Sequence, residues 1–135
     1  MNQRSKTQNN PPNEINSLKQ ILNRLRRQGR IKIALLYGSY AEGKPHKRSD
    51  IDLAVLISSQ DQNKREEITN EILMASETPV SLLLLDDEDE SPFVVQEALK
   101  GIHLVDPDWD TFYAKSHWAI HEAEGIRFRR AANGK

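Results

Sequence analysis

Apolar residues along the chain follow two spacings, one typical of helices and one typical of strands. Spacings of three and four residues predict amphipathic helices, whereas short, nearly continuous apolar runs between turn residues predict buried strands. The helical spacing predicts helices over residues 13–29, 60–76 and 91–101 and from residue 106 onward, with a single helical turn after Gly38. The apolar runs predict strands over residues 31–37, 50–57 and 79–85, with a short edge strand over 102–105. This alternation predicts a mixed α/β or α+β domain, a sheet with helices on one side.

The two ends of the chain differ from its middle. Residues 1–13 are almost wholly polar and lack apolar periodicity, so we expect a disordered leader there. A length of 135 residues suits one domain with a good core and is short for two. We therefore expect a single domain over residues 14–130 and a flexible tail over 131–135.

Composition excludes several classes of protein. The 19 basic and 20 acidic residues nearly cancel, so bulk charge gives no reason to expect nucleic-acid binding. The absence of cysteine excludes disulfides and thiolate zinc sites. No apolar segment approaches the roughly 20 residues that span a bilayer, and the polar start lacks a secretory signal. A cytoplasmic protein is expected.

Candidate chemistry lies in residues 35–56, which read LLYGSYAEGKPHKRSDIDLAVL. Gly38 and Ser39 follow a strand and begin a helical turn, where backbone amides and a hydroxyl can approach a phosphate closely. Asp50 and Asp52 stand two apart on the next strand, so both carboxylates share one face. Two close like charges favour a divalent cation, and oxygen-only ligands suit magnesium. Together the two half-motifs predict a nucleoside-triphosphate site.

These residues resemble a known family. Gly38-Ser39, ten further residues and Asp50-Ile51-Asp52, within the strings GSYAEG and SDIDLAV, are similar to the minimal nucleotidyltransferases (MNT) of the DNA polymerase beta superfamily. The resemblance spans about residues 31–105, including a Gly-Ile-His-Leu stretch after a helix. It implies an α+β fold with a mixed sheet flanked by helices, Gly38 and Ser39 holding the triphosphate, and Asp50 and Asp52 as catalytic metal ligands. Lys47, in the loop between the half-motifs, could also contact the phosphates.

One position departs from the family pattern. Active members carry a third acidic residue on a later strand, and matching that string to residues 79–82 puts Ser81 in its place. A serine hydroxyl is a weak metal ligand and a poor base, so two-metal chemistry would be impaired. Asp86 points to the opposite face of a regular strand, and Asp87 lies about 20 Å further along. We therefore expect neither to replace the carboxylate.

The resemblance also implies a partner. Short family members are often encoded beside a helical HEPN-domain toxin, and the MNT protein acts as a type VII-like antitoxin that adenylylates a toxin tyrosine with ATP and magnesium. This chain offers no obvious accessory domain to hold an acceptor, which fits a protein partner. Two alternatives stay open. One is a weakened binding module that neutralises its partner by contact, and the other is a nucleotidyltransferase for a small hydroxylated molecule such as an aminoglycoside.

The last predicted helix carries two further candidate features. His117 and His121 stand four apart, a spacing that can bind a metal, but no third ligand is near in sequence, so surface histidines are favoured. The aromatic residues Trp109, Phe112, Tyr113 and Trp118 are expected to pack on the sheet or on a partner rather than on a base.

Overall fold

The computed structural model describes residues 13–45 and 50–133, and it contains the helices and strands that the sequence predicts. Their bounds are α2 (Asn13–Arg27), β1 (Ile31–Tyr37), α3 (Gly38–Ala41), β2 (Ile51–Ile57), α4 (Gln62–Leu73), β3 (Val80–Leu84), α5 (Pro92–Leu99), β4 (Ile102–His103) and α6 (Trp109–Asn133). The expected leader lies almost wholly outside the described residues. The last helix continues three residues into the segment that we expected to be a flexible tail.

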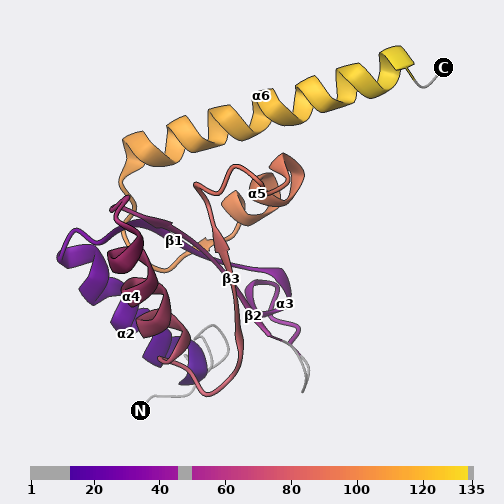
Figure 1. Ribbon diagram of the computed structural model, residues 1–135. Helices are drawn as coiled ribbons and strands as arrows, with labels where there is room; N and C mark the ends of the chain where they lie inside the picture. Colours follow the sequence, from indigo (N-terminus) through magenta and orange to yellow (C-terminus); the bar gives the residue numbers. More distant parts are fainter. Residues whose placement is uncertain (1–12, 46–49, 134–135) are drawn as a thin grey trace.

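The four strands form one mixed sheet in the order β3-β2-β1-β4 (Figure 1). β1 is antiparallel to β2 and to β4, whereas β2 and β3 are parallel. The parallel pair is joined by α4, as a crossover connection requires. The predicted fold class is confirmed, and the order of the strands, which the sequence did not reveal, places β1 and β2 at the centre.

Helices cover both faces of this sheet. On one face α2 and α4 pack against the apolar side chains of β2 that alternate with Asp52: Ile51, Leu53, Val55 and Ile57. On the other face α5 and α6 pack against Ile33, Leu35, Ala54 and Leu83. Our expectation of helices on one side is wrong, because the central strands carry apolar residues on both faces and both must be covered.

Local sequence explains where several elements begin and end. The Asp61 side chain accepts a hydrogen bond from the Lys64 amide and caps α4. Ser91 accepts one from the Phe93 amide and caps α5, with Pro92 in its first turn. Gly29, at φ 74°, ends α2. These are the capping patterns that the sequence predicts.

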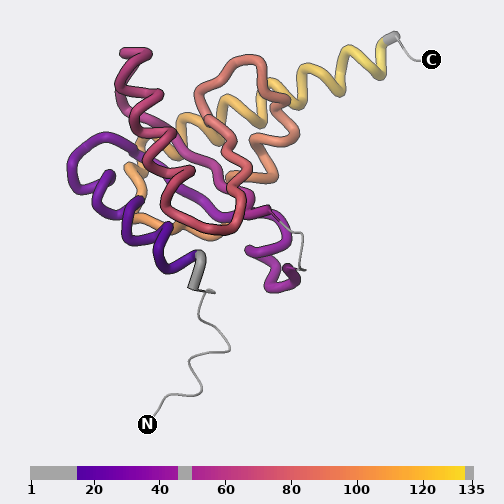
Figure 2. Tube along the Cα trace, turned by 60° about the horizontal axis from the view of Figure 1, so that its bottom comes forward, coloured from indigo at the N-terminus to yellow at the C-terminus, as the bar shows by residue number. Residues whose placement is uncertain are grey.

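α6 is the least buried of the long helices. Only Ala119 and Ala123 are buried among its residues from Trp109 to Ala132, whereas α2 buries four large aliphatic side chains. Burying one such side chain stabilises a fold by about 1.5–3 kcal/mol, so α6 gains less from packing than α2. Figures 1 and 2 show α6 passing over α5, with its C-terminal half extending beyond the rest of the molecule. Within the described residues, no helix is long and apolar enough to cross a membrane.

Candidate active site

Gly38 lies directly against the carboxylate of Asp52. It directly follows β1 and begins α3 with a φ of 74°, a conformation that glycine adopts without strain. A Cβ atom at this position would lie 2.2 Å from Asp52 Oδ2 and 3.1 Å from its carboxyl carbon. Any side chain here would collide with the carboxylate. The fold therefore brings the two predicted half-motifs together, and only glycine allows the contact.

Asp52 stands in the middle of a row of side chains across three strands. It is paired with Tyr37 of β1 on one side and with Ser81 of β3 on the other. Directly paired residues present their side chains on the same face of a sheet. Tyr37 packs with the residues under α5 and α6, so the row lies on that face.

The electrostatics of this row favour a bound cation. Burial raises the pKa of the Asp52 carboxyl, and the negative charge of Asp50 raises it further. Among residues 13–45 and 50–133, no lysine or arginine forms an ion pair with either carboxylate. Two hard oxygen donors beside a close backbone approach fit magnesium together with a phosphate. These residues can hold the metal that the sequence predicts, although their roles as ligands stay predictions.

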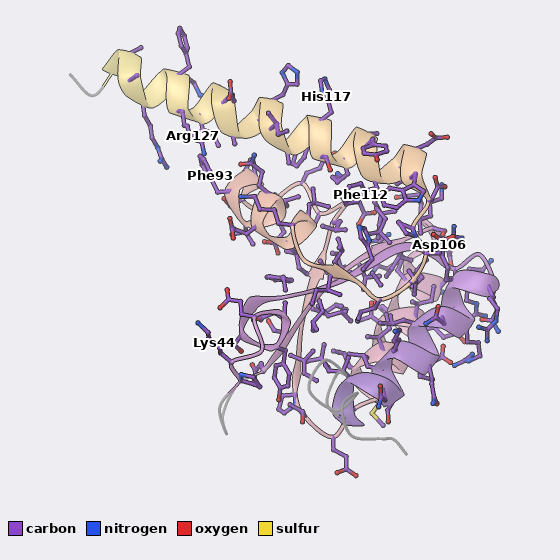
Figure 3. All side chains as sticks on the ribbon, turned by 180° about the vertical axis from the view of Figure 1, so that it is seen from behind. Lys44, Phe93, Asp106, Phe112, His117 and Arg127 are labelled. Atoms are coloured by element: carbon purple, nitrogen blue, oxygen red, sulfur yellow. The ribbon has the colours of Figure 1, made fainter. Side chains whose placement is uncertain are left out.

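Ser39 is the second residue of α3, the short helical turn that begins at Gly38. The turn is closed by hydrogen bonds from the Glu42 amide to the Gly38 carbonyl and from the Lys44 amide to the Ser39 carbonyl. Its first backbone amides have no acceptor within the turn and can donate to an anion. Lys44 is exposed at the outer side of this region (Figure 3). Lys47, the predicted phosphate contact, lies outside the described residues.

Ser81 occupies the position beside Asp52 that the motif comparison indicates. The parallel register pairs the two residues directly, and Ser81 is exposed. Within the described part of the chain, no group of three or more acidic or histidine side chains could hold a metal ion. The hydroxyl of Ser81 is therefore the polar group that β3 contributes to the row.

Asp86, the first residue of the acidic run after β3, does not take the place of the third carboxylate. The two carboxylate oxygens of Asp86 accept hydrogen bonds from Arg65 at 3.0 and 2.9 Å, and both side chains are largely buried. Such a bidentate pair ties Asp86 to α4. Asp87, Glu88 and Asp89 are exposed.

Tyr37 is a further residue of the site. Tyr37, which motif matching missed, has a raised pKa because of burial and of the charges of Asp52 and Glu90, so its hydroxyl lies in the field of the site. Its position directly before Gly38 on the predicted strand was the available signal.

His117 and His121 have ring centroids 4.3 Å apart on the exposed side of α6, away from Asp52.

We expect Gly38→Ala to lower the free energy of unfolding by about 1–3 kcal/mol, because it adds backbone strain and a clash with Asp52. Gly29→Ala is a matched control, since Gly29 has the same φ of 74° and no atom within 4 Å of the place that an added Cβ would take. Urea unfolding followed by circular dichroism compares the two. Equal losses would contradict a contribution from the contact with Asp52.

Comparison with known proteins supports the assignment of the fold. The family profile described as "Polymerase beta, Nucleotidyltransferase" matches residues 19–110. A search among curated proteins gave no significant match.

Three similar solved structures come from toxin–antitoxin complexes. The first, a toxin–antitoxin with AMP-PNP, is 24% identical, with a TM-score of 0.64 over 84% of this chain and 93% of that chain. A mutant of MntA–HpeT is 27% identical, with a TM-score of 0.63 over 84% and 90% of the two chains. A tri-AMPylated Shewanella oneidensis HEPN toxin in complex with MNT antitoxin is 20% identical, with a TM-score of 0.60 over 88% and 93%.

The family profile covers more than half of the chain and includes both half-motifs. Its range contains Gly38, Ser39, Asp50, Asp52 and Ser81, which are the residues from which the site was built. The chain therefore belongs to the polymerase beta nucleotidyltransferase family.

Proposed function

We propose that this protein is a cytoplasmic MNT antitoxin that transfers AMP from ATP to a tyrosine hydroxyl of a HEPN-domain toxin. The contact of Gly38 with the Asp52 carboxylate carries this proposal. It places a backbone that can approach phosphates directly beside a carboxylate that can hold magnesium. A triphosphate and its metal can therefore share one site.

The residues of the site have separate tasks in such a transfer. Gly38 and the first amides of α3 bind phosphate oxygens, and Asp50 and Asp52 hold the metal. Magnesium, when bound, would neutralise the charge that develops on the phosphoryl group. The transfer forms a bond between the tyrosine oxygen and the α-phosphorus, releases pyrophosphate and frees the hydroxyl proton. Ser81 is a poor acceptor for that proton.

The solved relatives agree with this proposal in two respects. One similar structure contains AMP-PNP, an ATP analogue. Another is described as an AMPylated HEPN toxin bound to its MNT antitoxin. Both are statements about those proteins, and they support a search for the same chemistry here.

Ser81 favours a second candidate function. If a family member needs a third carboxylate beside Asp52, this chain carries an exposed hydroxyl there instead. The protein would then keep the fold and some nucleotide affinity while neutralising its partner by contact. Its antitoxin activity would not require ATP hydrolysis or transfer.

One assay separates the two functions. The protein is incubated with labelled ATP, magnesium and the product of the adjacent gene, which we expect to be a HEPN-domain toxin. We expect label on the partner, and no label when EDTA removes the metal, because two uncompensated carboxylates repel the triphosphate. A stable complex without label would contradict the transferase and support neutralisation by contact.

A further inference from the structure

A small pocket lies at the end of β1 and β2 that is farthest from the candidate active site. It has a volume of about 280 Å³ and is enclosed by the turn before β1, the two serines after β2 and the first turns of α4. Ile31 pairs with Ile57 at this end of the strands. Tyr37 and Asp52 pair at the other end, about 20 Å away at roughly 3.3 Å per residue. Figure 1 shows the turn from α2 into β1 and the helix α3 on opposite sides of the molecule. We call this cavity the β1–α4 pocket.

Ser58 contributes a hydroxyl that has no partner among the described residues. Its Oγ atom is buried and accepts or donates no hydrogen bond within that part of the chain. The Ser58 amide donates to the Arg30 carbonyl at 2.8 Å, which fixes both residues in the wall of the pocket. Buried polar groups are nearly always paired, so this hydroxyl calls for a partner. Rotation about its Cα–Cβ bond can turn it toward the pocket without moving the backbone.

The charges around the β1–α4 pocket favour an anion. Arg30 and Lys64 line it, and among the described residues that form its wall Glu67 is the only carboxylate. Glu71 lies 3.8 Å from the Arg30 guanidinium, and its other oxygen is bound by Arg24. Within residues 13–45 and 50–133, Lys64 forms no ion pair. The positive charge of Arg30 and Lys64 is therefore incompletely matched by the protein.

The size and shape of the pocket limit the ligand. Pockets for drug-sized molecules measure about 300–1,000 Å³. A volume of about 280 Å³ accommodates a phosphate group with a small substituent but is small for a nucleoside triphosphate. A guanidinium presents parallel N–H donors that match two phosphate oxygens. A Cβ atom added at Gly29 would meet no atom within 4 Å, so this side is open and a substituent can extend through it.

We infer that the β1–α4 pocket binds a phosphate group, either as free phosphate or as the phosphoryl end of a small molecule. Arg30 and Lys64 neutralise the anion, and the Ser58 hydroxyl donates a hydrogen bond to one of its oxygens. The site is separate from the triphosphate site at Gly38, and the inference does not rest on the proposed function. The ligand would join the turn before β1 to the start of α4, so its binding should stabilise the folded protein.

Titration of the isotope-labelled protein with inorganic phosphate at constant ionic strength, followed by amide chemical shifts, tests the inference. We expect saturable shifts at Gly29, Ser58 and Ser59. Arg30→Gln should raise the Kd at these amides about tenfold to a hundredfold, because it removes a charge-assisted contact. Arg27→Gln is the matched control: Arg27 is exposed, carries the same charge three residues earlier and does not line the pocket. It should leave the Kd at the wild-type value.

Ser58→Ala tests the role of the unpaired hydroxyl. Without phosphate, its removal should leave the free energy of unfolding unchanged or slightly higher, because no internal hydrogen bond is lost. With phosphate, the same variant should bind about twofold to tenfold more weakly. Thermal unfolding with and without phosphate measures both effects. A variant that is destabilised without phosphate and binds it as the wild type does would overturn the role of Ser58.

Other outcomes would overturn the site itself. Shifts confined to Gly38 and Ser39 would place phosphate in the active site alone. Equal weakening by Arg30→Gln and Arg27→Gln would mean that phosphate is attracted by diffuse charge and not by this pocket. Glycerol phosphate distinguishes the two sources of the ligand when the site is present. Tighter binding than that of inorganic phosphate would assign the pocket to a phosphorylated molecule, and equal or weaker binding would assign it to free phosphate.

Discussion

Asp52→Asn should lower the rate of AMP transfer by about 10²–10³-fold or more, the range seen when one group that stabilises transition-state charge is removed. The amide keeps the size of the side chain and its fit against Gly38, but it loses the charge that holds the metal. Circular dichroism verifies that the variant is folded, so that a loss of transfer can be assigned to the site. Single-turnover transfer with labelled ATP measures the loss.

The same substitution should stabilise the protein when no metal is present. Folding raises the pKa of Asp52, mainly by burial and then through Asp50, so the folded state binds a proton more tightly than the unfolded state. The stability that Asp52 contributes therefore falls as the pH rises from the ordinary aspartate pKa through the raised pKa. Above the raised pKa, the full destabilisation by the ionised carboxylate is present. Asp52→Asn avoids this destabilisation at pH 7, and its free energy of unfolding should match that of the wild type near pH 3. Thermal unfolding at both pH values measures the difference.

A matched carboxylate shows whether these effects belong to the site. Glu67 is exposed on α4, which covers the other face of the sheet, and Glu67→Gln should leave both transfer and stability unchanged. Magnesium with ATP should raise the melting temperature of the wild type and of Glu67→Gln but not of Asp52→Asn. An Asp52→Asn protein that transfers AMP at the wild-type rate would exclude this residue as the metal ligand.

The sequence predicted the part of the site that depends on short-range pattern. Gly38 stands at the end of an apolar run, and Asp52 alternates with the apolar positions of a strand, so each could be assigned to its element. The spacing of the two half-motifs then indicated that the fold brings them together, and the structure confirms this contact. The pairing of Ser81 with Asp52 followed from matching a family string and not from periodicity.

The sequence could not predict features that depend on how distant elements pack. The covering of both faces of the sheet depends on strand order, which apolar runs alone do not encode. Tyr37 became part of the site only when the register placed it opposite Asp52. The aromatic residues of α6 divide between core and surface, because Phe112 faces the sheet whereas Tyr113, one position later, is 62% exposed. Phe112 and Tyr113 are both aromatic, so residue type alone does not tell which of them is buried.

Ser81→Asp should raise the rate of AMP transfer by about tenfold to a hundredfold. General-base and metal-ligand groups contribute about 10²–10⁴-fold, and an introduced carboxylate gains part of that because its position is not refined. Ser81 is exposed and paired with Asp52, so a carboxylate there can reach the same metal and accept the tyrosine proton without burial. Transfer to the purified HEPN partner at saturating ATP and magnesium measures the change.

Ser81→Asn separates charge from size in this experiment. Asparagine has nearly the shape of aspartate but remains neutral, so it should leave the transfer rate at or below the wild-type value. A third carboxylate beside Asp52 and Asp50 also increases repulsion, and Ser81→Asp should therefore be less stable than Ser81→Asn without metal and should recover with magnesium. Equal transfer rates for the two variants would show that the position beside Asp52 is not where the third charge acts. A rate gain confined to Ser81→Asp would instead mean that the natural serine limits the rate of a site that is otherwise complete.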